Sequence, residues 1–139
     1  MIRMNSQKGM SLIEILVVLA IIGTIAATVG RSVFGSKEKS KVGTVKIQIS
    51  KIENAVNEFY NDCDQLPDTL DQLINEPGSE ICESWGLGGA YAKERDLIDP
   101  WKNDFEYEQT SQGFKITSFG KGGAPGGEGL EKDISSEDL

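Results

Sequence analysis

The chain has 139 residues, a formal net charge of −8 and no histidine. Binding to nucleic acid needs clustered Lys and Arg side chains, so this acidic balance argues against a nucleic-acid partner. The missing histidine removes the commonest catalytic base and the commonest transition-metal ligand, and no motif of an activated nucleophile is present. We therefore expect no enzyme, and a membrane-anchored hydrolase with paired carboxylates is the distant alternative.

The first element is an apolar run over residues 10–29 that contains a single carboxylate, Glu14. A helix of about 20 residues is about 30 Å long, which is enough to cross a bilayer. No small-x-small cleavage site follows the run, so the layout differs from that of an ordinary secretory signal. An acid inside a membrane is costly, and Glu14 is therefore expected to have a function and a partner. Gly30 and Gly35 leave open whether the helix unwinds where the run ends.

The sequence from Lys8 to Glu14, Lys-Gly-Met-Ser-Leu-Ile-Glu, resembles the prepilin peptidase site of type IV pilins and type II secretion pseudopilins. The resemblance implies cleavage between Gly9 and Met10, methylation of the new N-terminus at Met10, and a role for Glu14 in assembly. A plain N-terminal anchor with a chance glutamate is the alternative.

The same resemblance implies three parts and a location. The parts are a cleaved leader at 1–9, a transmembrane and polymerisation helix at 10–30, and a globular head at 31–139. Lys and Arg flank both ends of the apolar run, so charge alone leaves the orientation open. The resemblance implies a single pass through the bacterial inner membrane, with the head in the periplasm.

Residues 37–60 have an amphipathic pattern. The apolar positions recur in steps of three and four and form one helical stripe of Val42, Val45, Ile49, Ile52, Val56 and Phe59. We expect a surface helix that packs on the core of the head and continues the membrane helix. The segment 61–64 is expected to end this helix, and Pro67 opposes its continuation. Asp68 is expected to cap a short helix that runs to Ile74.

Cys63 and Cys82 are the two cysteines of the chain and enclose a loop of about 20 residues. Small domains outside the cytoplasm use such bridges because their hydrophobic cores are thin. We expect a disulfide that ties the end of the striped helix to the loop around Trp85, with two free thiols as the alternative. The spacing and the lack of further Cys or His argue against a zinc site.

The segment 99–103, Asp-Pro-Trp-Lys-Asn, resembles the Asp-Pro-Trp-Gly-Asn signature of major pseudopilins, with Lys102 in place of glycine. Glycine is favoured where φ is positive, so the conformation at Lys102 is an open point. Two alternating strands follow at 105–107 and 114–118, joined by a hairpin turn at 110–113. The expected fold is α+β: a long N-terminal hydrophobic helix packed on a small C-terminal antiparallel sheet with an irregular acidic loop.

The tail after residue 118 is rich in glycine and acid, and composition alone suggests a flexible segment. A calcium loop is the functional interpretation, because calcium takes six to eight oxygens and glycines let a chain wrap around it. Segment 118–134 is similar to the calcium loop of major pseudopilins. The matching positions are the carbonyls of Phe119 and Ala124 and the carboxylates of Glu131 and Asp133, with Glu128 nearby. Gly122 replaces a usual aspartate ligand, so a weak or metal-free site is the alternative.

These resemblances together imply a major pseudopilin subunit, which polymerises into a short periplasmic pseudopilus that drives protein secretion across the outer membrane. The implied partners are other copies of the chain, minor pseudopilins, the prepilin peptidase, the inner-membrane secretion platform and the membrane itself. In the filament Glu14 would meet the N-terminal amine on Met10 of a neighbour. A type IV pilin or a minor pseudopilin is the alternative.

Overall fold

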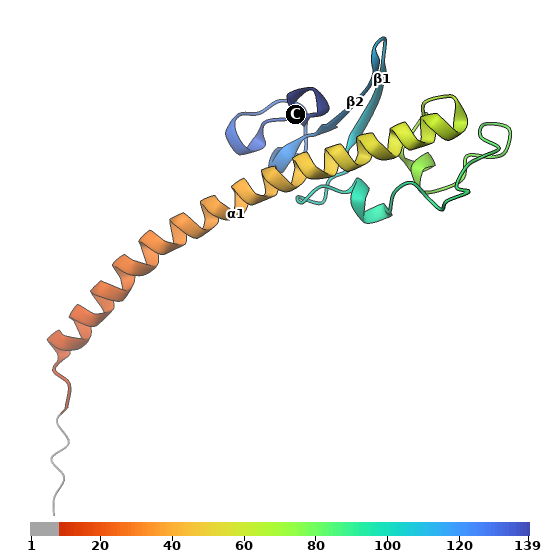
Figure 1. The fold of residues 1–139 in the computed structure, drawn as a ribbon. Helices are drawn as coiled ribbons and strands as arrows, with labels where there is room; N and C mark the ends of the chain where they lie inside the picture. The colour runs from red at the N-terminus through yellow and green to blue at the C-terminus, as the bar shows by residue number, and fades with distance from the viewer. Residues whose placement is uncertain (1–8) are drawn as a thin grey trace, which may run out of the picture. The chain divides into compact units, whose positions relative to one another are not determined.

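The computed structural model describes residues 9–139, except for the side chains of residues 31–34. The expected leader therefore lies, up to residue 8, outside the described residues. One helix, α1 (Leu12–Cys63), is followed by short 3-10 helices and by three strands, β1 (Glu106–Thr110), β2 (Gly113–Ser118) and β3 (Ile134–Ser135) (Figure 1). The helix and the small antiparallel sheet confirm the expected α+β class.

The chain forms two compact units that meet between Lys37 and Glu38, inside the single helix α1. In the first unit the apolar side chains of the run 12–29 are exposed, and by length and composition this helix can cross a membrane. The helix is continuous through Gly30 and Gly35, so neither glycine interrupts it. The expected division of the chain at residue 30 stays a prediction.

The second unit, Glu38–Leu139, has its own hydrophobic core. Helix α1 supplies about half of the core, through Ala55 and the stripe that the sequence predicted, and Val42 is the one partly buried member of the stripe. The other side chains of the core come from after the helix: Leu70, Leu73, Phe105, Ile116 and Ile134. Each large side chain that is fully buried contributes about 1.5–3 kcal/mol, so the stripe is what holds the head on its helix.

The sheet has the strand order β1-β2-β3 and is antiparallel throughout. The predicted hairpin is present: Tyr107 pairs with Ile116, and a two-residue connection follows Thr110. The sequence did not predict β3, which pairs Ser135 with Thr117 at the other edge of β2. Figure 1 shows this C-terminal segment returning beside β2. The return folds the acidic tail back onto the sheet.

The short helix after α1 differs from its prediction. It is a 3-10 helix at Leu70–Leu73, and the residue before it is Thr69 rather than Asp68. The backbone N–H of Asp68 donates to Oε1 of Gln72, at 3.0 Å. The prediction of an Asp68 cap was therefore wrong, because Thr69 holds the cap position and no side chain caps the helix there.

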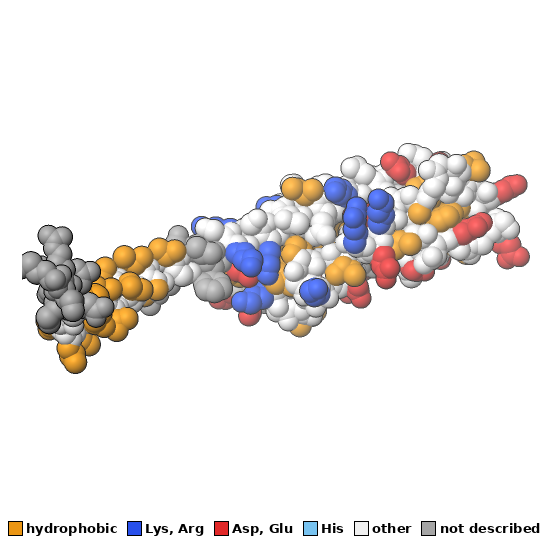
Figure 2. Space-filling model, turned by 90° about the horizontal axis from the view of Figure 1, so that it is seen from below, with side chains coloured by type: hydrophobic (Ala, Val, Ile, Leu, Met, Phe, Trp, Pro, Cys, Tyr) orange, Lys and Arg blue, Asp and Glu red, His pale blue; other side chains and the backbone are white. Residues whose placement is uncertain are grey.

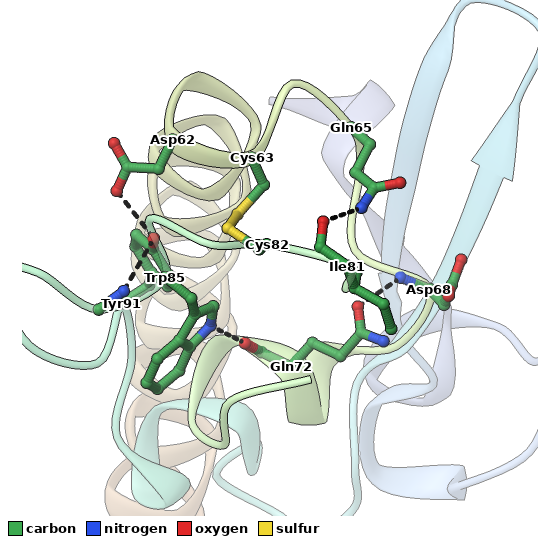
Figure 3. The surroundings of a disulfide bond; sticks show 10 residues. Asp62, Cys63, Gln65, Asp68, Gln72, Ile81, Cys82, Trp85 and Tyr91 are labelled. Carbon is green, nitrogen blue, oxygen red and sulfur yellow. Dashed lines mark hydrogen bonds between the residues drawn. A yellow bond between two sulfur atoms is a disulfide. The ribbon is translucent and has the colours of Figure 1, made fainter. Parts of the chain in front are cut away.

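A disulfide joins Cys63 to Cys82 and ties the end of α1 to the following loop (Figure 3). The Trp85 indole N–H donates to the carbonyl of Gln72, at 2.7 Å, and the Tyr91 hydroxyl donates to Asp62, also at 2.7 Å. The Tyr91 ring lies edge-on to both Phe59 and Trp85. The bridge and these aromatic contacts hold the loop on the helix.

Candidate functional site

The turn at 99–103 is built around a buried carboxylate. Asp99 is 3% exposed, and its Oδ1 accepts the backbone N–H groups of Trp101 and Asn103 at 3.0 and 2.9 Å. Its Oδ2 accepts the hydroxyl of Ser118, which is fully buried in β2, at 2.8 Å. Lys102 has φ +67, so the lysine adopts the left-handed conformation that favours glycine. The carboxylate thus fixes the turn to the sheet.

The same turn reaches the start of the acidic loop. The side-chain amide of Asn103 donates to the carbonyl of Gly120 at 3.4 Å, and the Gly120 N–H donates to Oγ of Ser118 at 3.3 Å. Gly120 has φ +62, and a Cβ there would lie 3.0 Å from the carbonyl of Lys132. The beginning and the end of the loop therefore meet at Gly120, where only glycine fits.

The expected calcium ligands lie in two places around this loop. Glu131 and Ala124 line a hollow of about 240 Å³ together with Gly122, whose Cβ, if present, would lie 3.5 Å from the Cβ of Glu131. Asp133 is half-buried, and its Oδ2 accepts the N–H of Gly126 at 3.0 Å. Its Oδ1 is buried and has no hydrogen-bond partner among the described residues.

The remaining expected ligands contribute less to this arrangement. Glu128 is exposed at the start of a 3-10 helix, Gly129–Glu131, and Phe119 is half-buried at the end of β2. Among the described residues no three Asp, Glu or Cys side chains converge on a metal position. A cation here would therefore depend on Asp133 and on backbone carbonyls rather than on a cluster of carboxylates.

A second set of contacts joins the turn to the start of the head's helix. The indole N–H of Trp101 donates to the Glu38 carboxylate at 3.1 Å, and Lys41 pairs with the other oxygen of Glu38 at 3.4 Å. The Lys41 ammonium also lies 5.9 Å from the centre of the Trp101 ring. The hydrogen bond from Trp101, followed by the contacts with Lys41, lowers the pKa of Glu38 despite some desolvation. Sequence reasoning missed this group, because no local pattern links residues so far apart.

The predicted assembly residues lie at the exposed beginning of α1. Met10 is 62% exposed, and Gly9 and Glu14 are exposed as well. The backbone N–H of Glu14 donates to the carbonyl of Ser11, at 3.0 Å, and lies 3.4 Å from its Oγ. Ser11 therefore caps the helix, and Glu14 occupies the position where a capping box has Glu or Gln.

Comparison with known proteins identifies the family. The family model described as type II secretion system protein G matches residues 32–137, which is more than half of the chain. The chain belongs to the type II secretion system protein G family. A second model, the prokaryotic N-terminal methylation motif, matches residues 4–30 and so covers the predicted cleavage site and Glu14. Both matches confirm the family that the sequence resembles.

Two curated relatives carry the name type II secretion system core protein G. The protein of Xanthomonas campestris pv. campestris is 38% identical over 130 residues, covering 92% of this chain and 88% of the relative. The protein of Vibrio cholerae is 33% identical, covering 96% and 94%. The crystal structure of the major pseudopilin from the type 2 secretion system of enterohaemorrhagic Escherichia coli matches 73% of this chain and 87% of that one, with a TM-score of 0.59. At 22% identity this likeness shows the pseudopilin fold.

Membership in this family makes the chain a membrane-anchored pseudopilin of type II secretion. The assignments of Gly9, Met10 and Glu14 to individual steps stay predictions, and so does the ligand set of the acidic loop.

Proposed function

We propose that this chain is cleaved between Gly9 and Met10, is methylated at Met10, and polymerises through the first part of α1 into a periplasmic pseudopilus that acts in protein secretion across the outer membrane. The observation that carries the proposal is the exposed apolar surface over residues 12–29 in a chain of the protein G family. Such a surface is stable in a bilayer or against identical helices, and a filament of parallel subunits supplies the second environment.

Glu14 is the residue that sets how the helices pack. In a filament the carboxylate would pair with the N-terminal amine on Met10 of a neighbouring subunit. Both charges are expensive in an apolar bundle when they are unpaired, so their pairing favours the register in which they meet. The other partners of this proposal are the prepilin peptidase, minor pseudopilins and the inner-membrane secretion platform.

Substitutions at Glu14 test this assembly mechanism in cells that carry the secretion system. Glu14→Leu should leave insertion and cleavage intact, as read from the intact mass, but should strongly reduce crosslinked multimers and secretion of a reporter protein. Glu14→Asp should be intermediate because the shorter side chain loses reach. Gly9→Val is the control that blocks cleavage and leaves the chain monomeric in the membrane.

Glu14→Gln separates pairing of charge from capping of the helix, since a capping box accepts either residue. The pairing mechanism predicts that Glu14→Gln assembles as poorly as Glu14→Leu. Normal assembly of Glu14→Gln beside a defective Glu14→Leu would assign the residue to the cap at Ser11. Normal assembly of both variants would remove Glu14 from the mechanism altogether.

We also propose that the loop at 118–134 binds calcium. The free Oδ1 of Asp133 supports this, because a buried carboxylate oxygen without a partner is costly and a cation would satisfy it. The carbonyls of Phe119 and Ala124 and the carboxylate of Glu131 are the other donors on the loop, with Glu128 beside them. Bound calcium would hold the two ends of the loop together.

Thermal unfolding of the head with calcium and with a chelator tests the site. A hundredfold excess of calcium over Kd stabilises the folded state by about 2.7 kcal/mol, and Asp133→Ala should abolish the difference between the two conditions. Gly122→Asp should strengthen binding, since position 122 faces Glu131 and a Cβ fits there at ordinary contact distances. Gly122→Ala is the matched control. Identical melting with and without calcium in the parent would contradict the proposal.

A further inference from the structure

The charges of the head are separated along its helix. Residues 39–51 hold four lysines and no acid, whereas residues 53–92 hold nine Asp or Glu and no Lys or Arg. On the face in view in Figure 2, one end of the head shows acidic side chains and no Lys or Arg, whereas Lys and Arg side chains lie along the rest of the head. With a rise of 1.5 Å per residue, about 35 Å of helix separates Lys39 from Asp62.

Few of these charges are neutralised within the chain. Among the described residues there are two ion pairs, Lys41 with Glu38 and Lys115 with Glu137, and neither involves residues 53–92. In the acidic segment the side chains of Glu58, Asp62, Asp64, Asp68, Asp71, Glu76, Glu80 and Glu83 are exposed. Lys39 and Lys46, at the other end, are exposed as well and lie seven residues apart, on one side of the helix.

The acidic end is unfavourable for an isolated head. The carboxyl end of a helix carries partial negative charge and is stabilised by cations, yet the last turn of α1 has no basic residue. Asp62 lies in that turn and Asp64 follows it directly, so negative side chains meet the negative end of the dipole. A cationic partner at this end would offset the repulsion.

We propose that the acidic end of one head, represented by Glu80 and Glu83, docks on Lys39 and Lys46 of a second copy of this chain. The partner is a second copy because the complementary lysines lie on the same compact unit, at the other end of the head's helix. The inference rests on the proposed function, in which all anchors insert in the same direction. Parallel copies displaced along α1 bring opposite ends of their heads together, whereas an antiparallel pair would point the two anchors in opposite directions.

The contact uses different patches on the two copies, so it does not close on itself. Such a heterologous contact, repeated along an axis, gives an open filament rather than a dimer. Exposed ion pairs are weak because salt screens charges over about 8 Å at physiological ionic strength. The anchors therefore hold the filament together, and the contact between heads sets the register of neighbouring copies. The contact between heads thus determines how neighbouring copies are positioned, while the anchors provide most of the binding.

A zero-length carbodiimide crosslinker tests the contact in membranes that contain the full chain. The reagent joins a lysine amine to a carboxylate as an amide, with loss of water, only where the two groups touch. Labelled and unlabelled copies are expressed together, so that peptides from different copies are recognised by mass. We expect links from Lys39 or Lys46 to Glu80 or Glu83 between copies.

Charge reversal gives the second readout. Lys39→Glu with Lys46→Glu, and separately Glu80→Lys with Glu83→Lys, should each reduce head-to-head links and secretion, by roughly twofold to fivefold for each pair lost. The chain with all four changes should recover to near the parent level, because the pairs are restored with the signs exchanged. Glu94→Lys with Glu106→Lys is the control for Glu80→Lys with Glu83→Lys, because it makes the same charge change on exposed residues outside both charged ends. This control should change neither the links between heads nor secretion.

The inference alone is overturned by multimers of the parent that lack these links, or by a variant with all four changes that recovers nothing. Links from the acidic end to a different protein would do the same. A parent that forms no multimers at all overturns the proposed function, and this inference with it.

Discussion

Removing the Asp99 carboxylate should destabilise the head more than any other single polar substitution at the turn. Asp99→Ala leaves three donors without an acceptor, and one of them, the Ser118 hydroxyl, is fully buried. An unsatisfied buried donor costs about 1–3 kcal/mol, and water can reach the half-buried N–H groups of Trp101 and Asn103 in part. We therefore expect a loss of about 3–5 kcal/mol, a large share of the 5–15 kcal/mol typical of a domain.

Urea unfolding of residues 38–139, with the disulfide intact and followed by circular dichroism, measures this loss. Asp99→Asn keeps an acceptor for the backbone N–H groups and should cost less, about 1–2 kcal/mol. The exposed Asp104→Ala is the matched control and should stay within about 0.5 kcal/mol of the parent. A loss of less than about 1 kcal/mol for Asp99→Ala would refute the reasoning, because it would mean that the three bonds contribute nothing net.

Two further predictions concern the ends of the head's helix. Replacing Cys63 and Cys82 together by serine should lower the free energy of unfolding by about 3 kcal/mol in the same assay, and thiol labelling of the parent without reductant should find neither cysteine. Trp101→Phe should raise the pKa of Glu38 toward its usual value, as read by NMR titration, because the indole hydrogen bond is the main cause that lowers it. The lowered pKa means that the carboxylate stabilises the head above its unfolded-state pKa and loses this effect as the pH falls through the folded-state value. The part of the stability difference between parent and Trp101→Phe that comes from this carboxylate should therefore disappear in acid.

The parts of the fold that the sequence predicted are those with a local repeat. The stripe from Val45 to Phe59 follows the helical period, and its side chains form the core as expected. The hairpin was predictable because alternation at Tyr107 and Ile116 surrounds a short polar turn. In both cases the pattern that predicts the element lies within one short segment of the chain.

The missed features depend on contacts between distant residues. Strand β3 has two residues, too few for any periodic pattern, and it exists because the tail returns to β2. The bond from Trp101 to Glu38 joins residues 63 positions apart. The cap expected at Asp68 failed because the 3-10 helix begins one residue later, after Thr69, whose side chain makes no capping bond. Two of the proposed calcium donors, the carbonyls of Phe119 and Ala124, belong to the backbone, which no side-chain pattern marks.

Different contacts hold the two ends of the head's helix, one of which carries lysines and the other acidic side chains. At the lysine end, a hydrogen bond from Trp101 to Glu38 fixes the helix to the Asp99 turn. Lys41 pairs with Glu38, whereas Lys39 and Lys46 take no part in these contacts. At the acidic end, the disulfide and the Tyr91 contact hold the loop that carries Glu80 and Glu83. Binding costs less when the groups that meet are already ordered. A head whose two charged ends are both held by such bonds can therefore use weak, exposed ion pairs to select one register among neighbouring copies. Reduction of the disulfide should weaken this selection before it unfolds the core.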